Sequence, residues 1–243
     1  MRCFFYDPAT VTGKTLRITG QQSRHIASVL RLTAQTRLTL YDGCGEIITG
    51  EIVHVSPEKT TVQILSRATA PQVTSPLILA QALLKGKKMD FLLQKATELG
   101  VDVFIPIHTR YCEKKIHALE RQKRRWQRII LEACKQCHRP VPMRIEQPVE
   151  LTQLSIPDCS NLIMPWEDET SQPLTAQLIS PQFPTLLLIG PEGGFHPDEI
   201  HFASNAGFTT VSLGPRILRA ETAALAATSI IQYIHRNLDP APR

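Results

Sequence analysis

Residues 186–199 have the sequence LLLIGPEGGFHPDE, in which an apolar run enters a glycine-rich loop and then the start of a helix. The apolar run predicts a strand that is buried on both faces, as in a parallel sheet. Pro197 near the first helical position, followed by two acidic residues, predicts the helix. Ligands of parallel sheets bind beyond the carboxyl ends of strands, and glycines let the backbone approach a ligand. We therefore expect a binding site at residues 190–194.

A second loop of the same kind lies at residues 211–224, VSLGPRILRAETAA. A predicted strand again ends at a glycine, Gly214, and a helix begins near Arg219–Glu221. The first loop, at 190–194, matches neither the dinucleotide fingerprint G-x-G-x-x-G nor the Walker phosphate loop, so neither NAD nor ATP is indicated. Arg219 and Glu221 alone could be a capping pair, but beside a second glycine loop they predict a site.

The rest of the pattern predicts two domains, 1–72 and 73–243, joined by a linker at 69–76. The first domain is expected to be a small β-barrel with strands at 2–6, 14–18, 36–41, 46–55 and 60–65, and a short helix at 23–32 that Ser23 caps. In the second domain, strands alternate with helices, which predicts an α/β fold with a mainly parallel sheet. The expected strands are 77–84, 101–107, 162–164, 185–189 and 209–213, and the expected helices are 89–99, 121–138 and 220–236.

Composition limits the class of protein. With 243 residues of which 42% are hydrophobic, the chain can bury a core, so general disorder is excluded. The sequence contains no apolar run long enough for a membrane span, and its first residues meet a charge and a proline too soon for a signal peptide. We therefore expect a cytoplasmic protein without a membrane partner, in which the six cysteines are reduced.

Charge is uneven along the chain, although the net charge is only +5. Basic residues are in excess over 73–144, where Lys85, Lys87 and Lys88 precede Lys114, Lys115 and the run at 121–125, whereas acidic residues are in excess over 145–243. Such a concentration can neutralise phosphates, so nucleic acid is an expected partner. The alternative is a solvated helix face.

The segment Cys134-Lys135-Gln136-Cys137-His138 fits the pattern of c-type haem attachment. We reject haem because both cysteines fall on the apolar stripe of one predicted helix, where cysteine behaves as a small buried hydrophobe. No second Cys/His pair has zinc-binding spacing, so no metal is expected. The opposite face carries a polar stripe, which either is exposed or lines a groove for RNA; it comprises Arg125, Arg128, Glu132, Gln136 and Arg139.

The motifs GPEGGF at 190–195 and LGPRILRAETA at 213–223 together resemble the ribosomal RNA small subunit methyltransferase E family. The segments at 24–31, 95–101 and 125–142 agree with the resemblance, while Cys137-His138 departs from the small residue and glycine usual there. The resemblance implies a PUA-like β-barrel followed by a SPOUT methyltransferase domain with a trefoil knot, an exception to unthreaded topology. It also implies a homodimer that transfers a methyl group from S-adenosylmethionine to N3 of a uridine in small-subunit (16S) ribosomal RNA. The substrate would be either the free RNA or the assembled subunit.

Roles follow from this resemblance. Arg219 is expected to stabilise the uridine anion, and Glu221 is a second catalytic candidate, with the base left open. The expected cofactor-binding residues are Gly190, Pro191, Glu192, Gly193, Gly194, Leu213, Gly214, Ile217, Leu218 and Thr222. The expected RNA-binding residues are Arg24, His25, Arg31, Lys85, Lys88, Arg125, Arg128 and Arg139. Two alternatives remain: a ribose 2′-O methyltransferase of the same superfamily, and a non-catalytic RNA-binding factor for ribosome assembly.

Overall fold

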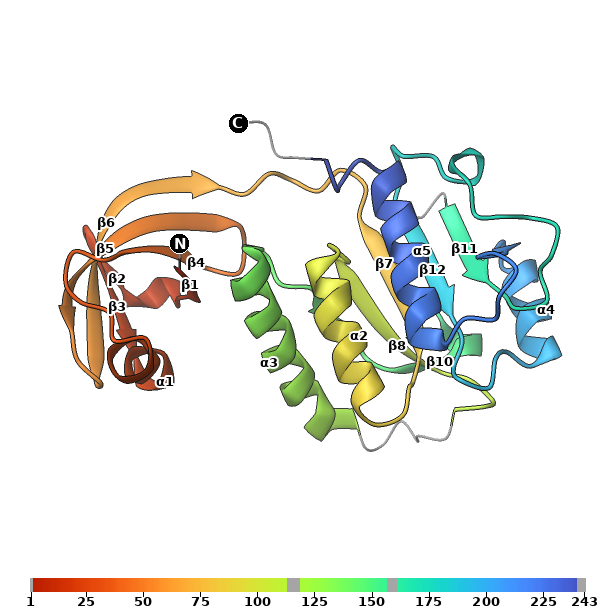
Figure 1. Cartoon of the computed structure of the whole chain (residues 1–243), viewed down its shortest axis with the longest axis horizontal. Helices are drawn as coiled ribbons and strands as arrows, with labels where there is room; N and C mark the ends of the chain where they lie inside the picture. The colour runs from red at the N-terminus through yellow and green to blue at the C-terminus, as the bar shows by residue number, and fades with distance from the viewer. Residues whose placement is uncertain (1, 113–118, 157–160, 240–243) are drawn as a thin grey trace. The chain divides into compact units, whose positions relative to one another are not determined.

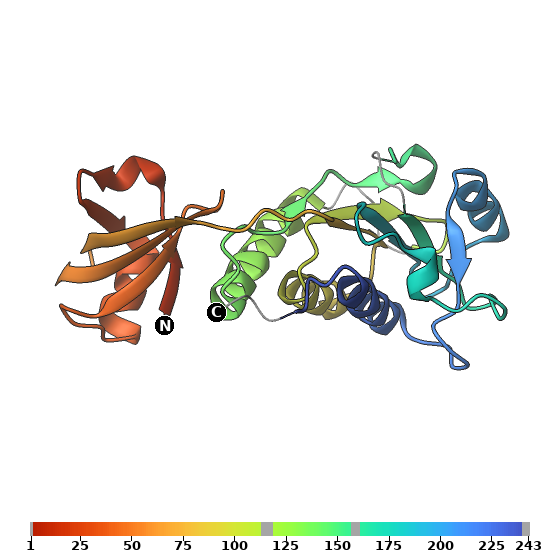
Figure 2. The ribbon, with the colours of Figure 1, turned by 90° about the horizontal axis from the view of Figure 1, so that it is seen from above.

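A computed structural model describes residues 2–112, 119–156 and 161–239, and the chain forms two compact units (Figures 1 and 2). The first unit combines Met1–Gln72 with Cys134–Pro142, and the second combines Val73–Ala133 with Met143–Arg243. The expected basic residues Lys114 and Lys115 lie outside the described residues.

The first unit is built on one six-stranded sheet with the order β1-β4-β5-β6-β3-β2. Its neighbouring strands are antiparallel except β1 and β4, which are parallel. Alternate apolar residues such as Leu16, Ile18, Leu38 and Leu40 face a single core, as the period of two predicts. The strands are β1 (Arg2–Phe5), β2 (Val11–Thr12), β3 (Thr15–Thr19), β4 (Arg37–Tyr41), β5 (Glu46–Val55) and β6 (Lys59–Thr69).

The short helix of this unit begins earlier than the sequence predicts. Helix α1 (Gly20–Arg24) follows Thr19 and continues into a single π-helical stretch, η2 (His25–Val29). The prediction that Ser23 is the N-cap is therefore wrong. Ser23 lies within α1, and its side chain is fully buried. Its hydroxyl donates to the carbonyl oxygen of Ser56 at 2.9 Å and contacts the Thr60 hydroxyl at 2.8 Å. These tertiary partners satisfy a side chain that would otherwise cap the helix.

The second unit contains a seven-stranded sheet whose described strands all pair in parallel. The strand order is β10-β8-β7-β12-β11-β13, and β9 also pairs with β8. This arrangement confirms the predicted α/β class. The strands are β7 (Leu77–Ala82), β8 (Val103–His108), β9 (Arg144–Ile145), β10 (Val149–Glu150), β11 (Asn161–Pro165), β12 (Thr185–Ile189) and β13 (Thr209–Val211).

Helices cover both faces of this sheet. Helices α2 (Lys87–Glu98) and α5 (Ala220–Ile234) lie side by side on one face (Figures 1 and 2). Helix α4 (Pro197–Asn205) contributes Ala203 to the core of the other face, with Leu186 and Leu188 of β12. Every residue of β7 and β12 is buried, which explains why both strands are continuous apolar runs apart from Gln81 and Thr185.

Helix α3 (Leu119–Cys137) is amphipathic, as its spacing predicts. Trp126, Ile130, Ala133 and Cys134 are buried, whereas Cys137 is only half-buried. The opposite stripe is exposed at Arg125, Arg128, Glu132 and Gln136. In the part of the chain that is described, no helix is long and apolar enough to cross a membrane.

Candidate functional site

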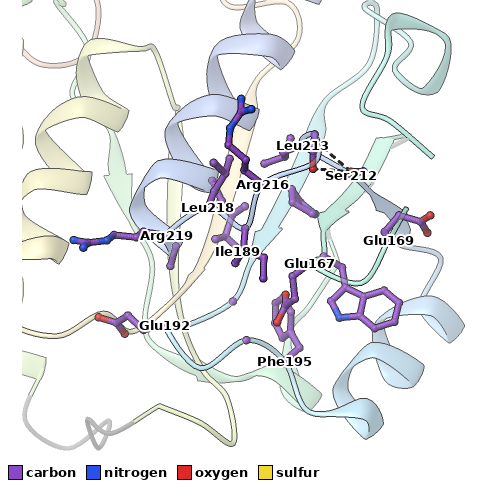
Figure 3. Close-up of a pocket in the computed structure, with 18 of the residues that line it drawn as sticks. Glu167, Glu169, Ile189, Glu192, Phe195, Ser212, Leu213, Arg216, Leu218 and Arg219 are labelled. Atoms are coloured by element: carbon purple, nitrogen blue, oxygen red, sulfur yellow. Dashed lines mark hydrogen bonds between the residues drawn. The ribbon is translucent and has the colours of Figure 1, made fainter. Parts of the chain in front are cut away.

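Three loops of the second unit meet around a cavity of about 770 Å³ (Figure 3). They follow strands β11, β12 and β13, which are neighbours in the order β12-β11-β13. Because these strands are parallel, their carboxyl ends lie at the same edge of the sheet, where ligands of such sheets bind. The volume is within the range of small-molecule sites.

The two glycine loops predicted from the sequence both line this cavity. The predicted cofactor residues in the wall are Gly190, Pro191, Glu192, Gly194, Leu213, Gly214, Ile217 and Leu218. Gly193 and Thr222 are not among the lining residues. Thr222 is exposed on α5, and Gly193 lies against Tyr111, whose Cβ is 3.1 Å from the position a Cβ of residue 193 would occupy.

The loop after β12 needs glycine because other groups approach it closely. A Cβ at Gly190 would lie 3.0 Å from the ring of the buried Phe195. Gly194 has a φ of +72°, and a Cβ there would collide with Oε1 of Glu167. The loop is therefore compact, and its glycines make room for protein groups as well as for a ligand.

The loop after β13 leads directly into α5. Gly214 has a φ of +109° and faces open space, and its N–H donates to Ser212 Oγ at 3.2 Å. Arg219 occupies the N-cap position of α5, and its exposed side chain extends to the same side of the cavity as Glu192 (Figure 3). Within the described ranges, the Arg219 guanidinium has no hydrogen-bond or ion-pair partner, so it is available to a ligand.

A third wall, which sequence reasoning missed, is formed by the loop after β11. It contributes Pro165, Trp166, Glu167, Glu169, Thr170 and Pro173. The N–H of Trp166 donates to the carbonyl oxygen of Val211 at 3.1 Å. The N–H of Ser212 donates to the carbonyl oxygen of Gln172 at 2.7 Å. The loop carries no glycine signature; only the pairing of β11 with β12 and β13 could have revealed it.

Glu169 holds this third loop in place. Its carboxylate accepts from the Ser171 hydroxyl at 2.6 Å, from the Ser171 N–H at 2.8 Å and from the Thr210 hydroxyl at 2.8 Å. These hydrogen bonds to the ionised form lower the pKa of Glu169 to about 2. The residue therefore links the loop to β13 as a carboxylate.

Glu192 is paired with α2 at the edge of the cavity. It accepts from Lys88 Nζ at 3.0 Å and from the N–H of Lys85 at 3.2 Å. Burial raises the pKa of Glu192, but these donors outweigh burial and the net shift is downward. Lys88, predicted to bind RNA, is thus also a lining residue of the cavity.

The second catalytic candidate, Glu221, does not line the cavity. It lies in the first turn of α5, and its Oε2 atom is buried with no hydrogen-bond partner in the described part of the chain.

The predicted RNA-binding residues lie in both units. In the first unit, Arg24, His25 and Arg31 are exposed on and just after the α1–η2 helix, and Arg139 donates from Nε to the carbonyl of Val141 at 2.8 Å. In the second unit, Arg125 forms an ion pair with Asp90, while Lys85 and Arg128 are exposed.

Across the described ranges, no three His, Cys, Asp or Glu side chains are grouped so that they could hold a metal ion.

Known proteins share this architecture. The profile of the RNA methyltransferase domain matches residues 71–232, and that of the RNA methyltransferase PUA domain matches residues 18–65. The chain thus combines a PUA-like domain with an RNA methyltransferase domain. The ribosomal RNA small subunit methyltransferase E of Buchnera aphidicola subsp. Schizaphis graminum is 31% identical over 237 residues, covering 90% of both chains.

Two solved structures agree with this match. The ribosomal RNA small subunit methyltransferase E of Neisseria gonorrhoeae, bound to S-adenosylmethionine, is 29% identical with a TM-score of 0.85, covering 96% of this chain and 98% of that one. A Legionella pneumophila methyltransferase in complex with the same cofactor is 33% identical with a TM-score of 0.79, covering 95% and 96%. The chain belongs to the ribosomal RNA small subunit methyltransferase E family, as its motifs predict.

Proposed function

We propose that this protein transfers a methyl group from S-adenosylmethionine to N3 of a uridine in small-subunit ribosomal RNA. The observation that carries the proposal is the cavity between three strand ends, with the exposed Arg219 guanidinium at its edge. The cofactor of the Neisseria and Legionella relatives fits the residues present here. Apolar side chains (Ile189, Leu213 and Leu218) suit an adenine, and the loop backbones supply polar groups.

When bound, S-adenosylmethionine supplies an electrophilic methyl group. The loops hold the donor in a fixed orientation, which favours in-line attack. Uridine N3 must lose its proton before it attacks, and the Arg219 guanidinium stabilises the resulting anion. Glu221 is placed outside the cavity wall, so Arg219 ranks first and the base stays unassigned. Because N3 takes part in Watson–Crick pairing, the target nucleotide must be unpaired or flipped out.

The remaining assignments complete the proposal. The domain at residues 1–72 holds structured RNA through Arg24, His25 and Arg31, and the domain at 73–243 contains the trefoil knot and performs the transfer. The enzyme acts in the cytoplasm as a homodimer. Exposed apolar side chains at Ile217, 86% exposed, and Tyr233, 73% exposed, support a partner surface near the cavity loop and on α5.

The test is nucleoside mass spectrometry of ribosomal RNA from cells with and without the gene. We expect loss of 3-methyluridine from the small-subunit RNA, and its return when the purified protein and S-adenosylmethionine are added to small subunits or to free RNA. Loss of a ribose-methylated nucleoside instead identifies the 2′-O methyltransferase. Unchanged nucleosides, together with no binding of S-adenosylmethionine in calorimetry, identify a non-catalytic assembly factor.

A further inference from the structure

Three glutamates line the cavity, and Glu167 differs from the other two in having no partner among the residues that the structure describes. Glu169 is bound by Ser171 and Thr210, and Glu192 is bound by Lys88. Glu167 is exposed, and over residues 2–112, 119–156 and 161–239 no hydrogen-bond or ion-pair partner reaches its carboxylate. Because no described group binds it, the Glu167 carboxyl group on the cavity wall is available to a ligand that donates hydrogen bonds.

The position of Glu167 is set by the two neighbouring loops. It follows Trp166, whose N–H is bound to the carbonyl of Val211, so its backbone is anchored beside β13. Its Oε1 occupies space that a Cβ at Gly194 would need, so the carboxylate lies directly against the glycine loop. Figure 3 shows it beside Phe195, with Arg219 on another side of the cavity.

The bound cofactor offers three kinds of donor to a carboxylate: the ribose hydroxyls, the methionine ammonium group and the adenine 6-amino group, the last of which a 2′-deoxy analogue leaves unchanged. The ribose is attached directly to the adenine, for which Ile189, Leu213 and Leu218 provide the apolar wall of the same cavity. The ammonium group is at the far end of the methionine chain. Acids near strand ends bind ribose hydroxyls in other nucleotide-binding parallel sheets. We propose that the Glu167 carboxylate accepts hydrogen bonds from the ribose hydroxyls of S-adenosylmethionine, an assignment that rests on the proposed function.

Binding calorimetry tests this with two probes, S-adenosylhomocysteine and 5′-methylthioadenosine. The second contains the ribose and adenine but has no amino-acid ammonium group. We expect Glu167→Ala to weaken both probes by the same factor, about 10-fold or more, because a charged hydrogen-bond acceptor is lost. Glu167→Gln, which keeps the shape and one acceptor, should weaken both probes less. The matched control is Asp168→Asn, since Asp168 is the exposed neighbour and does not line the cavity.

A 2′-deoxy analogue of methylthioadenosine gives a second readout that a structural role would not affect. It should bind the wild-type protein more weakly than methylthioadenosine, and this difference should shrink in Glu167→Ala. If only S-adenosylhomocysteine is weakened, Glu167 binds the ammonium group and the ribose assignment is wrong. If neither probe is weakened, Glu167 is not a ligand. If the wild-type protein binds neither probe, the proposed function itself fails, which is distinguishable from both other results.

Discussion

The side-chain amide of Gln81 donates from Nε2 to the carbonyl oxygen of Gly190 at 3.1 Å and to that of Ala82 at 3.0 Å. Gln81 is fully buried on β7, directly opposite Ile189 of β12. The β7–β12 pairing ends at Gln81 and Ile189, and the bond from the Gln81 amide to Gly190 adds one more hydrogen bond between the two segments. It also fixes the direction in which the glycine loop leaves the sheet.

Replacing Gln81 by leucine should loosen this loop. The carbonyl of Gly190 would lose a buried donor, which costs about 1–3 kcal/mol. We expect a lower melting temperature. We also expect the dissociation constant for S-adenosylhomocysteine to rise about 10-fold, because a loosened loop no longer holds its backbone in the geometry that binds the ligand. Calorimetry and thermal melts measure both quantities. The control is Gln94→Leu on the exposed face of α2, and an unchanged dissociation constant for Gln81→Leu would show that the loop is held by other contacts.

Arg219→Ala should separate catalysis from binding. The guanidinium is exposed and has no partner in the described ranges, so its removal should leave the fold and the affinity for S-adenosylhomocysteine nearly unchanged. Turnover should fall by about 100-fold or more, because stabilisation of the developing anion is lost. Arg219→Lys should recover part of the rate because it keeps the charge. The control is Arg144→Ala, an exposed arginine paired with Glu146. Full turnover in Arg219→Ala would contradict the assigned role.

Much of the second unit could be predicted from the sequence because each strand or helix has its own periodicity. The apolar run before Gly190 and the alanine-rich helix after Arg219 are local signals, and the structure has β12 and α5 there. The wall at residues 165–173 was not predictable in the same way. Its place depends on which strands β11 pairs with, and pairing is a long-range property that a single loop sequence does not contain.

The errors have physical causes of the same kind. Ser23 has the residue type of a helix cap, but its hydroxyl binds two distant residues instead: Ser56 in the turn between β5 and β6, and Thr60 on β6. The glycines of the 190–194 loop predict room for a ligand, and Gly190 and Gly194 do line the cavity, but packing adds a second role, since they also make room for Phe195 and Glu167. Local residue type predicts what a side chain can do, and tertiary packing decides which of these options is used.

Gly194→Ala should therefore damage the cavity more than the fold. The left-handed φ costs an alanine about 1–2 kcal/mol, and its methyl group must also displace the Glu167 carboxylate. We expect S-adenosylhomocysteine to bind at least about 10-fold more weakly, together with a moderate fall in melting temperature. Gly13→Ala is the matched control, because Gly13 also has a positive φ, +58°, but nothing lies within 4 Å of its added methyl group. Equal losses of affinity in the two variants would refute the collision argument.

Glu169→Gln should change the pH dependence of stability. The folded-state pKa of Glu169 is lowered to about 2 from an ordinary value of 4.5, mainly by hydrogen bonds from the Ser171 hydroxyl, the Ser171 N–H and the Thr210 hydroxyl. A lowered pKa means that the folded state binds the proton less readily than the unfolded state, so this stabilisation is complete above pH 4.5 and is lost as the pH falls towards 2. In thermal melts, the wild type should therefore have a higher melting temperature than Glu169→Gln at pH 7. This difference in melting temperature should shrink as the pH falls from 4.5 to 2. Asp168→Asn, which changes an exposed neighbour, should show no such closing gap. A gap that is constant with pH would mean that the Glu169 hydrogen bonds do not depend on its ionisation.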